Sequence, residues 1–209
     1  MHSGPCGNRA AAYSASNMNQ LVVTKVLRVE NTVLWKDYHR RKQAFQEFND
    51  SVSKGSLRGQ KRIKVQPPPH GHGDMVIDVD TNEFWLFHGT SWATSKIIAK
   101  AGFDERVGKM SGLYGSGVYF AENPCKSNQY NAVGTTPIGE RIIVYSRVLL
   151  GDVYETSTGL PGIRRAPNKP RISEPHDSVI AFGGTQVHKE YIVYNSTQSY
   201  PEFIVYYTV

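Results

Sequence analysis

The segment Leu86-Phe87-His88-Gly89-Thr90-Ser91 closes a short apolar run with a histidine and a glycine. The run over residues 83–87 predicts a buried strand. The end of a strand holds an imidazole on a rigid element, and a glycine has no side chain, so its backbone can approach a ligand amide closely. The segment therefore predicts a binding edge at the end of a strand.

Three further motifs follow this segment along the chain. They are Gly115-Ser116-Gly117-Val118-Tyr119-Phe120-Ala121-Glu122-Asn123, Lys126-Ser127-Asn128-Gln129-Tyr130 and Glu190-Tyr191-Ile192-Val193-Tyr194. The first two bring a serine and two tyrosines into a short span after the histidine. We therefore expect these side chains to line one cleft.

In this form and order, the four motifs resemble the catalytic domain of the poly(ADP-ribose) polymerase and tankyrase family, from about residue 21 to the C-terminus. The resemblance implies an α+β ADP-ribosyltransferase fold, in which antiparallel sheets fold around an NAD+ cleft with a few flanking helices. It also implies an enzyme that cleaves the nicotinamide glycosidic bond of NAD+ and transfers ADP-ribose to protein acceptors, with chain elongation left open. NAD+ is then the co-substrate, and no metal is expected.

The resemblance assigns a role to each matching position. The catalytic triad would be His88, Tyr119 and Glu190, and the residues that bind NAD+ would be His88, Gly89, Thr90, Asp104, Tyr119, Ser127 and Tyr130. Gly89 and Ser127 would hydrogen-bond the nicotinamide carboxamide, whereas His88 would bind the adenosine ribose. The rings of Tyr119 and Tyr130 would flank the planar, positively charged nicotinamide and hold it by stacking and cation–π attraction.

Two glutamates near the C-terminus compete for the catalytic role, because each opens a segment that predicts an apolar strand. The resemblance assigns the role to Glu190 and leaves Glu202 a structural role. A carboxylate is needed because cleavage of the glycosidic bond develops positive charge on the ribose, and a carboxylate that binds the 2′-hydroxyl stabilises this charge. The same group can act as a general base on an incoming hydroxyl.

Other kinds of site fit the sequence less well. The glycines of residues 112–117 follow the order G-x-x-G-x-G, whereas the dinucleotide fingerprint is G-x-G-x-x-G between a strand and a helix. His70 and His72 are spaced like weak metal ligands, but they lie in a loop rich in Gly and Pro, so no metal site is predicted. For Cys125, the sequence singles out no base that would activate it as a nucleophile.

The N-terminal part predicts a strand and a long helix. Residues 21–29 are rich in β-branched side chains and predict a strand, after which Asn31 or Thr32 can cap a helix. Helical spacing would turn one set of side chains inward, namely Leu34, Tyr38, Arg41, Phe45 and Phe48. It would turn another set toward solvent, namely Lys36, Arg40, Lys42 and Glu47. The Gly- and Pro-containing residues 54–72 then predict a loop.

The C-terminal part predicts mostly strands. A short helix over residues 92–101 would place Ile97, Ile98 and Ala101 on one face and end at a left-handed Gly102. Residues 104–111 would form a mobile loop over the site, because glycines follow closely. Strands are expected at residues 141–149, 190–194 and 202–208. Their long, mostly non-helical connections favour an antiparallel sheet folded on itself, and hence an α+β fold.

The net charge of +6 is unevenly distributed. Residues 21–66 hold eleven Lys and Arg against four acids, while residues 67–209 hold twelve against fourteen. A basic segment of this kind is compatible with nucleic acid as a partner. A solvated helix face followed by a basic loop is the simpler explanation.

Length and composition predict one catalytic domain over residues 20–209. Residues 1–19 lack apolar periodicity and are expected to form a disordered leader. The chain has neither an apolar run of membrane-spanning length nor the layout of a secretion signal, so no membrane partner and an intracellular location, cytoplasmic or nuclear, are expected. Cys6 and Cys125 are too few for a disulfide framework.

Two other functions remain open on the sequence alone. The first is a binding module that keeps the nicotinamide pocket without turnover and acts as a scaffold, although the intact triad speaks against it. The second is mono-ADP-ribosylation of nucleic-acid ends, guided by the basic residues 21–66.

Overall fold

The computed structural model describes residues 21–53, 77–130, 135–170, 173–183 and 186–208. The expected leader at residues 1–19 and the expected loop at residues 54–72, with His70 and His72, lie outside the described residues. The described residues form one mixed sheet with a few helices, as expected for an α+β fold. None of the described helices has the length and apolar character needed to cross a membrane.

Eight strands form the sheet, in the order β1-β8-β4-β2-β3-β7-β6-β5. Their bounds are β1 Val22–Arg28, β2 Glu83–Gly89, β3 Val118–Ala121, β4 Arg141–Leu149, β5 Val153–Thr156, β6 Ser178–Gly183, β7 Gln186–Val193 and β8 Ser199–Thr208. Every neighbouring pair is antiparallel except β5 and β6. The antiparallel sheet expected from the sequence is wrong at this pair, because the connection from β5 to β6 is long enough for the chain to return to the same end of the sheet.

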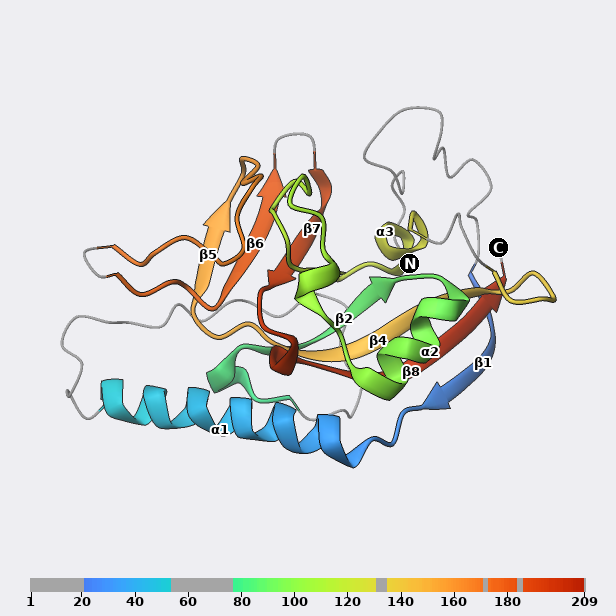
Figure 1. The fold of residues 1–209 in the computed structure, drawn as a ribbon, viewed down its shortest axis with the longest axis horizontal. Coiled ribbons are helices and arrows are strands. Elements are labelled where there is room, and N and C mark those ends of the chain that lie inside the picture. The colour runs from blue at the N-terminus through green and yellow to red at the C-terminus, as the bar shows by residue number, and fades with distance from the viewer. Residues whose placement is uncertain (1–20, 54–76, 131–134, 171–172, 184–185, 209) are drawn as a thin grey trace.

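The sheet divides at the junction of β2 and β3. These strands pair at one position, Phe87 with Ala121, whereas β2 pairs with β4 along its whole length, residues 83–89. Figure 1 shows the result: β2, β4 and β8 run across the molecule, while β5, β6 and β7 rise at a steep angle to them. The ends of β2 and β3 therefore border a space between the two halves of the sheet.

The expected strands are present, some with shifted bounds. The strand expected at residues 141–149 is confirmed as β4, and the one expected at residues 83–87 extends to Gly89 as β2. The expectation that Glu190 opens a strand is wrong, because β7 begins at Gln186. The expectation that Glu202 opens a strand is also wrong, because β8 begins at Ser199. Both strands begin earlier than expected, because the backbone of the preceding polar residues also pairs with a neighbouring strand.

The helices are α1 Thr32–Ser53, α2 Trp92–Ala101 and α3 Pro124–Asn128, with short 3-10 turns η2 Val79–Thr81, η3 Glu105–Val107 and η4 Ser196–Gln198. α2 has its expected bounds, because Ser91 accepts a hydrogen bond from Thr94 N and Gly102 ends the helix at φ 82°. Ile97, Ile98 and Ala101 share one side of α2, as expected, although Ile98 is buried and Ile97 is 63% exposed. Adjacent positions of a helix point about 100° apart, and α2 packs through one narrow face.

A buried cluster of charges fixes α1 beneath the sheet (Figure 1). Glu83 on β2 is 1% exposed and accepts hydrogen bonds from Tyr38 Oη and Lys42 Nζ, both at 2.7 Å. On β4, Arg147 Nη1 lies 3.4 Å from the Glu83 carboxylate, and Arg147 Nε lies 2.5 Å from Glu202 Oε2. The expectation that Lys42 faces solvent is therefore wrong, because a buried carboxylate on β2 binds it.

The environment of Glu83 keeps its carboxylate ionised. Burial alone would raise the pKa of Glu83. Hydrogen bonds from Lys42, from Tyr38 and from Asp78 N outweigh this effect, so the pKa lies below its usual value. Burial, together with the charge of Glu83, raises the pKa of Tyr38 well above its usual value. At neutral pH the cluster thus joins the ionised Glu83 carboxylate to a neutral phenol and to cations, and it attaches α1 to β2 and β4.

We expect Lys42→Met to lower the free energy of unfolding by about 2 kcal/mol, because it removes a charged donor from a buried carboxylate. The effect should be full above the unfolded-state pKa of Glu83 and should fade as the pH falls through its lowered folded pKa. Urea unfolding at several pH values measures both. Lys36→Met, on an exposed part of the same helix, should change stability by less than about 0.5 kcal/mol. Equal losses in the two variants would contradict the assignment.

Candidate functional site

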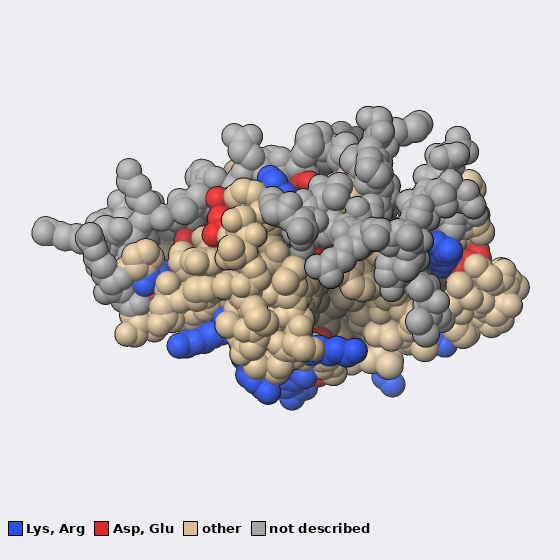
Figure 2. Space-filling model, turned by 90° about the horizontal axis from the view of Figure 1, so that it is seen from above, with Lys and Arg blue, Asp and Glu red and all other residues tan. Residues whose placement is uncertain are grey.

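A cavity of about 1110 Å³ opens between the two halves of the sheet. Its walls come from β2, α2, β3, α3, β7 and residues 104–116, which we call the cleft loop. Figure 2 shows the surface hollowed beside the central mass of the molecule. The predicted site residues that line the cavity are His88, Gly89, Asp104, Tyr119, Ser127, Tyr130 and Glu190. Thr90 is buried and does not line the cavity, so its contact with a ligand stays a prediction.

Gly89 ends β2 against the backbone of α3. A Cβ atom at this position would lie 1.8 Å from the carbonyl oxygen of Ser127, so a side chain does not fit. The Ser127 hydroxyl donates a hydrogen bond to the carbonyl oxygen of Phe87 at 3.1 Å. The glycine thus lets α3 pack directly on the end of the strand, with the serine beside it at the cavity.

The His88 ring is held in one tautomer. Its Nδ1 lies 2.8 Å from the carbonyl oxygen of Tyr119, and because a carbonyl only accepts, Nδ1 carries the proton. Burial lowers the pKa of His88 from 6.5, although the hydrogen bond opposes this shift, so the ring is neutral at neutral pH. Phe103 and Phe120 pack around it, with ring centroids 5.1 and 5.7 Å away. Nε2 is therefore an acceptor on a ring in a fixed position.

The two tyrosines predicted to stack on a ligand differ in how they are held. Tyr119 Oη accepts a hydrogen bond from Tyr114 N at 2.9 Å and donates one to Gly115 O at 2.8 Å. Burial raises the pKa of Tyr119 to about 12, so the phenol stays neutral. Tyr130 is 56% exposed, with Lys126 Nζ 5.8 Å from its ring centroid. One ring is thus anchored inside the cavity and the other lies at its rim.

Glu190 lies in the middle of β7 and is buried. Its neighbours on the adjoining strands are Ala121 on β3 and Ala181 on β6, so small side chains flank the carboxylate. Its Oε1 lies 2.8 Å from Nζ of Lys126 on α3, and each of the two side chains is 7% exposed. This ion pair engages one of the two carboxylate oxygens.

Glu202, the other candidate glutamate, does not line the cavity. It is buried on β8, where it binds Arg147 and lies 3.6 Å from Arg28. The structure thus separates two glutamates that look alike in the sequence. Glu190 lies at the cavity, and Glu202 belongs to the charge cluster beside α1.

The cleft loop forms one wall of the cavity and contains η3. Asp104 caps η3 and accepts two side-chain hydrogen bonds from Arg106, each at 2.9 Å, so its charge is balanced within the loop. At Gly115, with φ 69°, a Cβ atom would lie 2.1 Å from the carbonyl oxygen of Ile163. The glycine allows the loop to pack closely on residues 157–166, a role that the sequence reasoning missed.

Two arrangements near the cavity escape the sequence reasoning. In the sequence, Lys126 is recognised only as part of a motif, whereas in the structure it binds Glu190. Cys125 Sγ lies 3.5 Å from His188 Nε2, and Asn123 Nδ2 lies 3.3 Å from His188 Nδ1. The strand alternation that places positions 188 and 190 on one face of β7 is the signal that could have found this histidine. Both Cys125 and His188 are buried.

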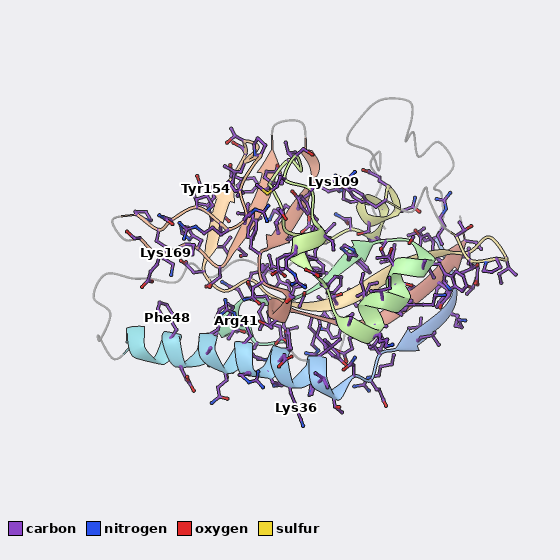
Figure 3. The ribbon with its side chains drawn as sticks, viewed as in Figure 1. Lys36, Arg41, Phe48, Lys109, Tyr154 and Lys169 are labelled. Atoms are coloured by element: carbon purple, nitrogen blue, oxygen red, sulfur yellow. The ribbon has the colours of Figure 1, made fainter. Side chains whose placement is uncertain are left out.

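The basic residues of α1 are largely paired within the fold. Their ion pairs are Arg40–Asp37, Arg41–Asp177 and Lys42–Glu83. Figure 3 shows Arg41 and Phe48 on the side of α1 toward the sheet and Lys36 on the opposite side. These pairs reduce the positive charge that α1 offers to a nucleic acid. Within the described ranges, no group of three His, Cys, Asp or Glu side chains could hold a metal ion.

Residues 8–209 match the family model described as the poly(ADP-ribose) polymerase catalytic domain. Over 143 residues the chain is 30% identical to a probable poly [ADP-ribose] polymerase of Dictyostelium discoideum, a match that covers 67% of this chain and 34% of that protein. Over 159 residues it is 28% identical to the protein mono-ADP-ribosyltransferase PARP12 of Mus musculus, covering 76% of this chain and 18% of that protein. The chain thus spans about a third or less of these curated relatives.

We expect Gly89→Ala to lower the free energy of unfolding by about 3 kcal/mol, because its Cβ would overlap the backbone of α3. Urea unfolding measures the loss. Gly139→Ala is the control, since its Cβ meets nothing within 4 Å and only the positive φ of 84° costs energy, about 1 kcal/mol. A loss no larger at Gly89 than at Gly139 would show that α3 does not depend on this contact.

Proposed function

The chain belongs to the poly(ADP-ribose) polymerase catalytic-domain family and is an NAD+ ADP-ribosyltransferase domain, and on this premise we propose its reaction and the role of each cavity residue. In this proposal the catalytic domain spans residues 20–209 and transfers ADP-ribose from NAD+ to protein side chains. The observation that carries the proposal is the buried Lys126–Glu190 pair in the same cavity as His88 and Tyr119.

The cavity has room for NAD+ and part of an acceptor, since about 1110 Å³ slightly exceeds the usual volumes of small-molecule sites. The nicotinamide carboxamide lies at the backbone of Gly89, and its ring lies between Tyr119 and Tyr130. Ser127 Oγ already donates to Phe87 O, so it accepts a hydrogen bond from the carboxamide N–H.

The adenosine half of NAD+ extends toward α2 and the cleft loop. His88 Nε2 accepts a hydrogen bond from an adenosine ribose hydroxyl, a role that its neutral ring and protonated Nδ1 support. Asp104, with its partner Arg106, borders the same part of the cavity. These assignments place the ribose of the nicotinamide half next to Glu190.

The reaction breaks the bond between ribose C1′ and the nicotinamide nitrogen, and the bonding electron pair leaves with neutral nicotinamide. The Glu190 carboxylate stabilises the positive charge that develops on the ribose by accepting a hydrogen bond from the 2′-hydroxyl. Lys126 is a positioning residue that holds the other carboxylate oxygen. The acceptor then bonds to C1′ and gives its proton to Glu190 or to solvent.

Chain elongation is compatible with this site. A carboxylate that can take a proton from an incoming ribose hydroxyl can extend a chain, and Glu190 is such a group. The names of the two relatives include one polymerase and one mono-transferase. We propose that Glu190 supports elongation, and the size of the product tests it.

We expect Glu190→Gln to lower the rate of nicotinamide release by about 10²- to 10³-fold, because an amide does not stabilise positive charge on the ribose. NAD+ binding should change little. Incubation with labelled NAD+, followed by a gel and by measurement of released nicotinamide, gives the rate and the product size. A high-molecular-weight smear indicates elongation, and discrete bands indicate transfer of single units.

Glu202→Gln is the matched control, since it makes the same chemical change at a buried glutamate outside the cavity. It should lower stability while leaving nicotinamide release intact. Loss of release in Glu202→Gln alone would contradict the assignment of Glu190. If the protein without substitutions binds NAD+ but releases no nicotinamide, it acts as a scaffold. If the label appears on added RNA rather than on protein, the acceptors are nucleic acids.

We expect the dissociation constant for NAD+ to stay constant from about pH 8 to 6.5 and to rise only below that range, because burial keeps His88 neutral to a pH lower than that of an ordinary histidine. A protonated ring could not accept the ribose hydrogen bond. Calorimetric titration at several pH values measures this constant. His88→Gln should bind NAD+ more weakly and without the acid-side rise, and weakening that begins above pH 6.5 in the unchanged protein would contradict a lowered pKa.

A further inference from the structure

Three cations lie along the outer edge of the cleft loop without an acidic partner among the residues that the structure describes. They are Lys109 in the loop, and Arg164 and Arg165 in the connection after β5. All three are exposed. Exposed charges on a flexible loop do not by themselves indicate a function. A fixed backbone, in contrast, holds such charges at a defined place where a partner can bind them.

The backbone that carries the two arginines is fixed on both sides. We call residues 157–166 the flanking segment. It is hydrogen-bonded to the cleft loop from Leu160 N to Leu113 O at 2.7 Å, from Gly162 N to Met110 O at 2.9 Å and from Ser116 N to Ile163 O at 2.8 Å. Ala166 is buried in the cluster of hydrophobic side chains against β6 and β7. The two arginines therefore lie between anchored residues and are presented outward at a defined place.

This place borders the mouth of the cavity. Lys109 and Leu113 of the cleft loop both line the cavity, and Leu113 also meets the flanking segment, since a Cβ at Gly159 would lie 2.8 Å from its Cδ1. Val107 and Leu113 are 80% and 47% exposed, so apolar side chains share the edge with the cations. Figure 3 shows Lys109 at this loop and Lys36 beyond α1, on the other side of the molecule.

The surface formed by the cleft loop and the flanking segment lies close to Glu190, and this position indicates which substrate it meets. Leu160 and Ala166 of the flanking segment belong to the cluster that covers Val179 and Ala181 on β6, and Ala181 is the direct neighbour of Glu190. An acceptor whose side chain reaches Glu190 therefore enters beside the flanking segment and the cleft loop. The residues before or after the modified position then lie near the unpaired cations.

We propose that the cleft loop and the flanking segment dock acidic segments of protein acceptors, with Lys109, Arg164 and Arg165 binding Asp and Glu side chains next to the modified residue. The inference rests on the proposed transfer to protein and names the class of acceptor. Charge complementarity of this kind raises the rate of encounter and selects among partners. Val107 and Leu113 add apolar contacts of the sort that a peptide, with its mixed side chains, can fill.

A protein segment fits this surface better than a nucleic acid does. Binding along a phosphate backbone draws its affinity from many cations in a continuous track. The other basic region described, on α1, lies on the far side of the molecule, and its cations are largely paired with acids.

The test measures binding to the full chain by fluorescence anisotropy. The probes are a fluorescein-labelled peptide of alternating Glu and Gly residues and the same peptide with Gln in place of Glu. We expect Arg164→Gln with Arg165→Gln to bind the Glu peptide about tenfold more weakly than the unchanged protein, because two exposed charge contacts are lost. Added salt should weaken binding in the unchanged protein more than in this variant.

The matched control is Lys36→Gln with Arg40→Gln, which removes the same net charge from α1, away from the cavity. It should bind the Glu peptide as the unchanged protein does, and the Gln peptide should bind none of the proteins. Equal weakening in the two double variants would overturn the proposal, since net charge alone would then attract the peptide. A single-stranded RNA of equal length that binds more tightly than the peptide would also overturn it.

Nicotinamide release without peptide separates this proposal from the proposed function. The arginine variant should release nicotinamide as fast as the unchanged protein, since neither arginine lines the cavity. No release from the unchanged protein would count against the transferase reaction, whereas unchanged peptide binding in the arginine variant would count against docking alone. Peptide binding and nicotinamide release are measured in different experiments, so either proposal can fail while the other holds.

Discussion

Among the residues that the structure describes, a single backbone pairing, Phe87 with Ala121, joins the two halves of the sheet, and the cavity lies where this pairing does not continue. Where the ladder between β2 and β3 stops, backbone groups at and beyond that pair must find other partners. Ser127 supplies one by donating its hydroxyl to Phe87 O, and His88 supplies another by donating Nδ1–H to Tyr119 O. The imidazole thus bridges β2 and β3 where the ladder ends, so the fold itself selects the tautomer that turns Nε2 into an acceptor.

Two buried systems of glutamate and cations serve different purposes in this fold. Glu83 and Glu202 share Arg147, and Lys42 and Tyr38 complete a cluster that joins three strands and a helix. The Lys126–Glu190 pair joins only α3 to β7 and lies at the cavity. Because a buried ion pair often stabilises a fold no better than apolar side chains of equal volume, stability alone gives no reason for a single ion pair that faces a cavity, and this observation supports the role proposed for Glu190.

Local sequence patterns were enough for elements with strong signals. The bounds of α2 and β4 follow from a terminal glycine and from apolar patterning, and the motifs identify the residues of β2, β3, α3 and β7 that line the cavity. β5 and β6 were missed, because they are short and their parallel pairing depends on a long connection. Lys42 with Glu83 and Cys125 with His188 lie 41 and 63 positions apart, so no local pattern could reveal these contacts.

The cavity is bounded by two units that meet at the β2–β3 junction. The cleft loop is hydrogen-bonded to residues 157–166, which pack on β6 and β7, so the loop is held by the same half of the sheet that carries Glu190. His88 and Gly89 belong to the other half, through the long pairing of β2 with β4. Glycines at close backbone contacts, such as Gly115 against Ile163, make the loop a packed part of its half rather than a separate flap. A change in the width of the cavity would therefore involve the Phe87–Ala121 pair, the His88–Tyr119 hydrogen bond and the hydrophobic core that both halves share. It would also involve α3, whose lysine and serine contact both halves.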